Sequence, residues 1–246
     1  MEVVYEDNHI IIVNKRPGEI VQGDKTGDEP LVETIRQYLK VKYNKPGNVF
    51  CGVVHRLDRP VGGLVVFAKT SKALARLNAM FRDGQVRKSY LAITRGMPAE
   101  SSGTLTHYIT STERNNKSYV HAREVNGSKR AVLDYALVGS TDRYNLLKVN
   151  LHTGRKHQIR VQLSAIGCPI KGDLKYGDRR SNPDGSISLQ AHRIRFVHPV
   201  SGAMIDVTAP VPADDVLWQA LAPQIAAMDA ADSAAYADGA SAQCRD

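Results

Sequence analysis

Two strand-like runs enclose a charged loop in the stretch NVFCGVVHRLDRPVGGLVVFAK, which covers residues 48–69. The runs 49–55 and 64–69 are rich in β-branched and aromatic residues, which favour strands. One proline and two glycines lie between them and favour a loop over a helix. Asp58 lies in this loop, between Arg56 and Arg59. The stretch therefore predicts two strands joined by a stiff loop that carries a carboxylate.

The same pattern of strands with a few helices continues on both sides of this stretch. We expect further strands at 3–5, 9–13, 90–94, 105–109, 118–124, 131–138, 146–151, 190–197 and 203–208, and helices at 30–42, 71–83, 156–166 and 214–228. Such an order predicts an α+β fold with a mixed, mainly antiparallel sheet core and flanking helices.

No linker interrupts this pattern, so we expect residues 1–228 to form a single catalytic domain. Ser71 can cap the helix that it begins, and Gly84 can end it. Residues 229–246 are small, polar and rich in alanine, and we expect them to form a disordered C-terminal tail.

The charge of the chain favours a polyanionic partner. Its 246 residues include 33 Lys and Arg against 25 Asp and Glu, a formal net charge of +8. Such a surplus fits nucleic acid, although many soluble proteins are mildly basic. No apolar run is long enough to cross a bilayer, and the acidic start of the chain lacks the pattern of a signal peptide. We therefore expect a cytoplasmic protein with no membrane contact.

Several cofactor and hydrolase motifs are absent from the sequence. It contains no phosphate-binding P-loop, no glycine-rich dinucleotide fingerprint, no H-E-x-x-H and no convincing serine nucleophile elbow. The three cysteines are far apart and form no C-x-x-C, and the eight histidines show no recognised metal spacing. An enzyme with this sequence is expected to work without a metal, a nucleotide cofactor or any other cofactor.

Asp58 is the first candidate for chemistry. Positive charge on both sides favours the ionised form of its carboxyl group, and a held carboxylate can act as a covalent nucleophile. The arginines beside it can instead grip phosphates. The plainer alternative is a surface aspartate in an arginine-rich turn.

Two more segments combine basic and aromatic side chains. Tyr90 follows Arg87 and Lys88 at the start of a predicted strand, where it is either a platform for base stacking or a half-buried tyrosine of the sheet. In the helix expected at 156–166, the spacing of His157, Arg160 and Ser164 places them on one face. Arg160 can thus reach into a cleft and pair with a carboxylate. The alternative is a solvated basic face that contacts phosphates.

Taken together and in order, these segments resemble the RluA-type family of RNA pseudouridine synthases. The resemblance covers most of residues 1–210. It rests on Tyr5-Glu6-Asp7-Asn8, Val13-Asn14-Lys15, Pro17-Gly18, His55-Arg56-Leu57-Asp58-Arg59-Pro60, Gly63-Leu64, Phe67-Ala68-Lys69-Thr70, Lys88-Ser89-Tyr90-Leu91-Ala92, Gly154-Arg155-Lys156-His157-Gln158-Ile159-Arg160, Pro169-Ile170-Lys171-Gly172-Asp173, Tyr176-Gly177, Leu189-Gln190-Ala191-His192 and Phe196-Val197-His198-Pro199. Several collinear motifs are far more specific than any one of them.

The resemblance implies the pseudouridine synthase catalytic fold and the isomerisation of selected uridines in RNA to pseudouridine. It implies that Asp58 is the nucleophile, that Tyr90 stacks on the uracil and helps to move the proton at C5, and that Arg160 pairs with Asp58. Arg56 resembles an arginine that fills the space left by the extruded nucleotide. Arg155 and His157 would then contact the RNA. None of these steps needs a cofactor.

The partner implied by the resemblance is ribosomal or transfer RNA, and we expect a monomer. Longer members of the family carry an S4-like RNA-binding domain, which we do not expect here. Two positions depart from the family pattern: Gln162 stands where many members have His, and Gly62 stands where Ser is frequent. The competing hypotheses are a non-catalytic RNA-binding or ribosome-associated module on the same fold and a basic DNA-binding protein.

Overall fold

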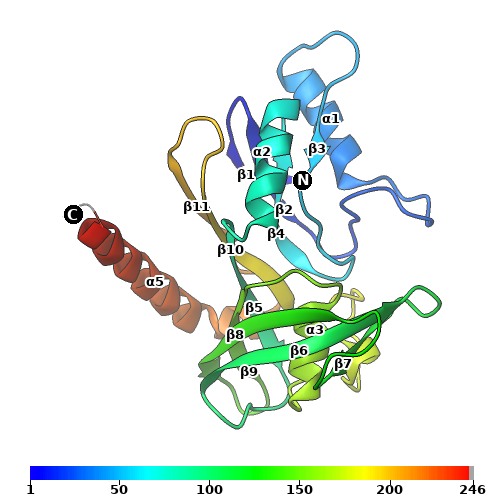
Figure 1. Ribbon diagram of the computed structural model, residues 1–246, viewed down its shortest axis with the longest axis vertical. Coiled ribbons are helices and arrows are strands. Elements are labelled where there is room, and N and C mark those ends of the chain that lie inside the picture. The colour runs from blue at the N-terminus through cyan, green and yellow to red at the C-terminus, as the bar shows by residue number, and fades with distance from the viewer. Residues whose placement is uncertain (244–246) are drawn as a thin grey trace.

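Eleven strands form one sheet that runs through the whole molecule (Figure 1). The computed structural model describes residues 1–243, with side chains to residue 236. The strands are β1 (Glu2–Glu6), β2 (Ile10–Lys15), β3 (Gly52–Val53), β4 (Gly62–Ala68), β5 (Arg87–Thr94), β6 (Ser102–Thr112), β7 (Lys117–His121), β8 (Lys129–Ser140), β9 (Asn145–Leu151), β10 (Leu189–Val197) and β11 (Met204–Thr208). The order along the sheet is β1-β2-β4-β10-β5-β9-β8-β6-β7. Outside this order, β3 pairs with β4 and β11 pairs with β10.

The two halves of the sheet meet where β4 pairs with β10. Within the described chain, this is the one parallel pairing, and it joins Gly62 and Gly63 to Gln190 and Ala191. Gly63 has a φ of +111°, and a Cβ atom there would lie 2.3 Å from the carbonyl oxygen of Ala191. Only glycine allows this close approach. The charged loop around Asp58 immediately precedes this junction.

Two helices, both expected from the sequence, cover the first half of the sheet. Helix α1 (Leu31–Lys42) buries Leu31, Ile35 and Leu39 against β2 and β4. Helix α2 (Ser71–Arg82) packs against the opposite face. Its N-cap is Thr70, whose hydroxyl accepts a hydrogen bond from the Ala73 amide, so the prediction of Ser71 as the cap is wrong by one residue.

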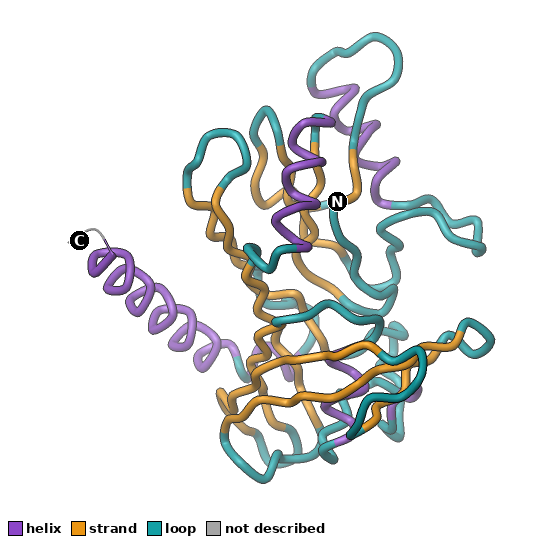
Figure 2. Tube along the Cα trace, in the orientation of Figure 1, coloured by secondary structure: helices purple, strands orange, loops and turns teal. Residues whose placement is uncertain are grey.

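The second half of the sheet carries helices on both faces. Helix α3 (Gln158–Ala165) packs on the face that includes Tyr90, and its Ile159 and Leu163 belong to that apolar cluster. On the other face, α4 (Val216–Ala220) and the start of α5 (Ala222–Gln243) cover Leu91 and Ile93. A short 3₁₀ helix, η1 (Leu174–Tyr176), lies in the connection between α3 and β10. Figure 2 shows the strands in orange and the helices in purple beside them.

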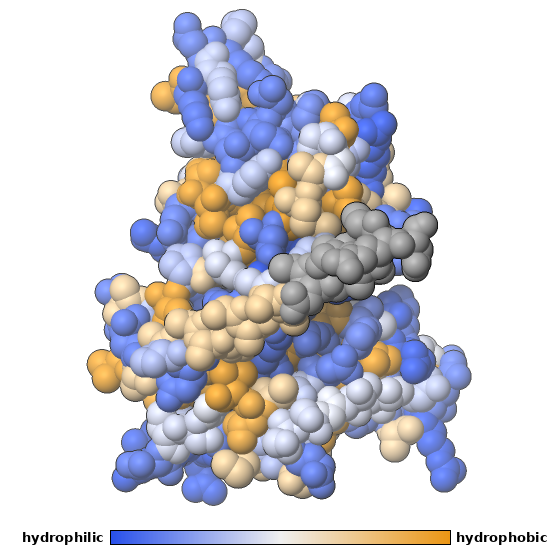
Figure 3. Space-filling view, turned by 90° about the vertical axis from the view of Figure 1, so that its left-hand side faces the viewer, coloured by the Kyte–Doolittle hydropathy of each residue, from blue (hydrophilic) through white to orange (hydrophobic). Residues whose placement is uncertain are grey.

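The expected disordered tail is wrong for residues 229–243, because α5 continues through them and projects from the body (Figure 1). Alanine has the highest helix propensity, and the alanine-rich surface of α5 forms a pale band across the face in Figure 3. The predicted helix 214–228 is in fact two helices. Residues 244–246 of the expected tail lie outside the described residues.

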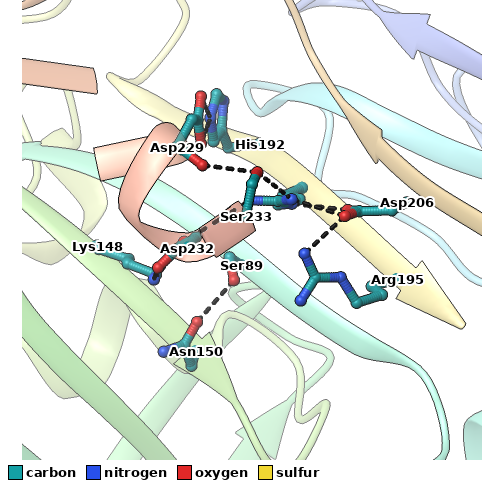
Figure 4. Close-up of polar contacts among 10 residues, drawn as sticks. Ser89, Lys148, Asn150, His192, Arg195, Asp206, Asp229, Asp232 and Ser233 are labelled. Carbon is teal, nitrogen blue, oxygen red and sulfur yellow. Dashed lines mark hydrogen bonds and ion pairs between the residues drawn. The ribbon is translucent and has the colours of Figure 1, made fainter. Parts of the chain in front are cut away.

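Polar contacts hold the part of α5 that follows its last apolar contacts (Figure 4). Asp229 accepts hydrogen bonds from His192, and Asp232 pairs with Lys148 at 2.5 Å. The Arg195 guanidinium lies 3.9 Å from the centre of the Tyr236 ring. Asp229 and Asp232 therefore have basic partners on β10 and β9.

The α+β class and the mainly antiparallel sheet are confirmed. Among the described residues, no helix has the length and apolar character needed to cross a membrane.

Candidate active site

A buried lysine holds the backbone of the loop that carries Asp58. The Lys15 ammonium donates hydrogen bonds to the carbonyl oxygens of Arg59 (3.1 Å) and Val61 (2.7 Å), just after Asp58. Burial lowers the pKa of Lys15 to about 8, while the charges of Glu19 and Asp58 act in the opposite direction. Three carbonyl acceptors, including that of Arg16, replace the water that this ammonium loses. The loop therefore has a defined backbone geometry at the carboxylate.

Arg160 reaches Asp58 across 102 residues of sequence. Its Nη1 donates to Oδ2 of Asp58 at 2.9 Å, while Nε and Nη2 donate to the two oxygens of Asp173 at 2.7 and 2.9 Å. Burial by itself would lower the pKa of Arg160, but the two carboxylates outweigh that effect and raise it. The guanidinium is therefore charged and held between two carboxylates.

The burial of this triad is uneven. The side chains of Arg160 and Asp173 are 6% and 1% exposed, whereas that of Asp58 is 28% exposed. Asp173 is thus an interior partner that orients the guanidinium through a bidentate contact. Asp58 is the member of the triad that a solute can reach.

Tyr90 lies on β5, next to Asp58. Its side chain is almost completely buried in the apolar cluster beneath α3. Burial raises the pKa of its hydroxyl group, and the negative charge of Asp58 raises it further. The hydroxyl group therefore keeps its proton at neutral pH, so it can donate a hydrogen bond.

The ring of His157, a residue expected to contact RNA, is largely buried. The structure turns its ring into the interior, where Nδ1 lies 2.7 Å from the Tyr176 hydroxyl and Nε2 lies 3.7 Å from Oδ2 of Asp58. Burial lowers the pKa of His157 to about 4, although the charge of Asp58 acts to raise it. The predicted common face of His157, Arg160 and Ser164 is confirmed, because all three contact Tyr176. However, α3 begins at Gln158, so His157 is its N-cap.

Asp58, Tyr90, His157 and Arg160 line an open groove of about 2090 Å³. The groove also contains Arg56, Lys88 and Arg155, so the expected RNA-contacting arginines share one concavity with Asp58, Tyr90 and Arg160. Arg59 points to another partner, since it pairs with Asp28 at 2.5 Å. Among the described residues, no group of three His, Cys, Asp or Glu side chains is arranged to hold a metal ion.

Sequence reasoning missed three supporting residues. Lys15, Asp173 and Tyr176 all lie in segments that carried the family resemblance, but the sequence alone assigned them no role. Their presence in those motifs was the available signal. Of the two departures, Gln162 hydrogen-bonds to Leu105 on β6, and Gly62 lies in the pairing of β4 with β10.

Comparisons with known proteins agree with this geometry. The family model for RNA pseudouridylate synthase matches residues 9–165. The ribosomal large subunit pseudouridine synthase D of Zymomonas mobilis is 33% identical over 87% of this chain and 70% of its own length. The protein of the same name from Pseudomonas aeruginosa is 34% identical over 89% of this chain and 70% of its own.

A solved structure shows the same fold. Human RNA Pseudouridylate Synthase Domain Containing 4 superposes with a TM-score of 0.72 at 24% identity, and the match covers 86% of this chain and 89% of the human one. The predicted fold and family are thus confirmed. The chain belongs to the RluA-type family of RNA pseudouridine synthases, which are isomerases that act on uridine in RNA.

Proposed function

We propose that Asp58 is the nucleophile of the isomerisation and that Arg160 holds it in its ionised form. The observation that carries this proposal is the 2.9 Å contact between Arg160 and the single accessible carboxylate of the buried triad. A charge-assisted hydrogen bond stabilises the carboxylate, and the groove gives a nucleoside access to it.

The reaction exchanges one bond of the uracil for another. The bond between N1 and the ribose C1′ breaks, the uracil turns in place, a bond forms between C5 and C1′, and the proton on C5 leaves as N1 gains one. Asp58 forms a transient bond to the nucleoside and is released unchanged. Tyr90 stacks on the uracil, and its protonated hydroxyl group assists the transfer at C5.

The proposed RNA contacts follow from the need of the target uridine to reach Asp58. A uridine within an RNA structure must leave its stack before Asp58 can reach it, at a cost of about a few kcal/mol. Arg56 is exposed on the loop of Asp58, where it can fill the space that the nucleotide leaves. The Nε of Arg155 donates to the Arg130 carbonyl, and its terminal nitrogens form no hydrogen bond with residues 1–236, so they are available for phosphate.

The proposed substrate is large-subunit ribosomal RNA, with transfer RNA as the second candidate. Two similar proteins carry ribosomal large subunit pseudouridine synthase in their names. We propose that residues 1–228 act as one catalytic unit, because a single continuous sheet runs through them. We further propose that this unit acts as a monomer in the cytoplasm, where its RNA substrate is found.

Mapping pseudouridine in cells tests the proposal. Total RNA from cells that lack this gene is compared with RNA after complementation by wild type, by Asp58→Asn or by Asp142→Asn, a control in the exposed turn between β8 and β9. We expect wild type and the control to restore the same ribosomal site, and Asp58→Asn to restore none. Restoration in transfer RNA alone would overturn the ribosomal assignment, and restoration by Asp58→Asn would overturn the nucleophile.

A further inference from the structure

A tyrosine behind the proposed nucleophile determines which nitrogen of a neighbouring histidine carries a proton. Tyr176 is buried in η1, and its hydroxyl oxygen lies 2.7 Å from two groups, the backbone N–H of Ser118 and Nδ1 of His157. The function described so far gives Tyr176 no task. Its two hydrogen bonds nevertheless have defined donors and acceptors.

The Ser118 amide can only donate, so the Tyr176 oxygen is its acceptor. Burial raises the pKa of Tyr176, which therefore keeps its own hydrogen. That hydrogen needs an acceptor, and among residues 1–236 Nδ1 of His157 lies at hydrogen-bond distance, whereas the Ser118 hydroxyl donates to the Lys156 carbonyl. If Nδ1 carried a proton instead, two donors would face the phenol oxygen and the buried phenol hydrogen would have no partner. The neutral His157 ring therefore has a bare Nδ1 and carries its proton on Nε2.

The proton on Nε2 faces the carboxylate of Asp58. The distance from Nε2 to Oδ2 is 3.7 Å, and Oδ2 is also the oxygen that accepts from Arg160. Oδ1 accepts no hydrogen bond from residues 1–236. Contacts in a free active site are often longer than in the complex, and a small rotation of the Asp58 side chain would bring Nε2 into hydrogen-bond range.

The backbone conformation of His157 supports this orientation of its ring. Its φ of 53° and ψ of 24° lie in the left-handed region, which is uncommon for a residue other than glycine. Such a conformation persists only where the surroundings determine it. Here it directs the ring toward Tyr176 and Asp58 at the start of α3.

We propose that His157 is a positioning residue for the reaction: the Tyr176 hydroxyl fixes its Nε2–H form, which together with Arg160 holds one oxygen of Asp58 and leaves the other free to attack the nucleoside. This inference rests on the proposed role of Asp58. It assigns His157 to the nucleophile rather than to RNA phosphates.

Nitrogen-15 NMR of the ring tests the proton placement without any activity. The His157 signals are identified by their loss in His157→Gln. We expect wild type to show a protonated Nε2 and a bare Nδ1, and Tyr176→Phe to show a mixture of the two neutral forms. Tyr135→Phe is the control, since it removes the hydroxyl group of another largely buried tyrosine, one that forms no hydrogen bond with residues 1–236. A protonated Nδ1 in wild type, or no change in Tyr176→Phe, would overturn the proposal.

Two substitutions separate the role of Nε2 from that of the backbone. Glutamine can place an amide N–H near the position of Nε2, whereas asparagine is too short but tolerates the left-handed backbone better. In single-turnover reactions we expect His157→Gln to be about tenfold faster than His157→Asn, with RNA affinities within about twofold of wild type. Asparagine equal to or faster than glutamine would show a purely structural role.

The failures of the two proposals are distinguishable. If wild type forms no pseudouridine, or if Asp58→Asn remains active, the proposed function fails. If wild type is active and Asp58→Asn is inert, but Gln and Asn at position 157 behave alike, only the positioning role of His157 fails.

Discussion

Each face of the second half of the sheet carries an ion pair between a basic side chain and an aspartate, but the two pairs differ in their exposure to solvent. On the face of α3, the Arg160 and Asp173 side chains are 6% and 1% exposed, and they form a bidentate pair. On the face of α5, Lys148 and Asp232 are 17% and 28% exposed (Figure 4). Water can replace either partner of the second pair but not of the first. The comparison teaches that an ion pair gives a fixed geometry where solvent is excluded, and a reversible contact where it is not.

The largest effect is expected from Asp173→Asn. This change removes the bidentate carboxylate of the buried Arg160 and leaves Asp58 as its charged partner. Breaking a buried pair costs about 3–5 kcal/mol. Urea denaturation should show that loss in the free energy of unfolding, together with a slower reaction, because Arg160 is no longer held toward Asp58. A loss below about 1 kcal/mol would mean that the two faces do not differ as described.

Tyr90→Phe is expected to change the reaction without changing the fold. The ring still stacks on uracil, whereas the hydroxyl group that assists proton transfer is gone, so single-turnover rates should fall by about a hundredfold. RNA affinity, measured by filter binding, should stay within about twofold of wild type. A large loss of affinity with intact turnover would show that Tyr90 acts in binding alone.

The pH dependence of stability should also report the buried face. The pKa of His157 is about 4 in the folded protein and about 6.5 in an unfolded chain. Between these values the unfolded state binds more protons, so stability is lost as the pH falls from about 6.5 to about 4. His157→Gln should make this slope shallower by up to about 1.4 kcal/mol per pH unit in denaturation curves. An unchanged slope would show that His157 is solvated.

The smallest effect is expected on the face of α5. Asp232→Asn removes one partner of a partly exposed pair, which costs at most about 1 kcal/mol. The difference between this variant and wild type should shrink as salt is added, because salt screens the pair. Thermal melts at low and high ionic strength measure it. A loss as large as that of Asp173→Asn would remove the distinction between the two faces.

Local patterns in the sequence predicted the helices and strands that depend on the spacing of nearby residues. The helix at Leu31–Lys42 and most of the strands follow from the spacing of apolar residues. The collinear motifs identified Asp58, Tyr90 and Arg160, and the structure brings these three together. These predictions needed no knowledge of which distant segments meet.

The remaining features depend on distant contacts that no periodicity reveals. Asp173, in the loop after α3, contacts Arg160 on α3. Lys15 donates to backbone carbonyls of a loop more than forty residues away, and the Tyr176 hydroxyl contacts the His157 ring. The extension of α5 was not predicted, because the partners of Asp229 and Asp232 lie on β10 and β9, far away in the sequence. Alanine content alone favoured a helix there.

The most direct test of the central claim is tritium release from RNA labelled at uridine C5. Purified wild type and the control Asp142→Asn should release the label at equal rates. Asp58→Asn should bind the same RNA with unchanged affinity and release none, because no carboxylate held by Arg160 remains to form the bond to the nucleoside. Release by Asp58→Asn at the wild-type rate would contradict the account.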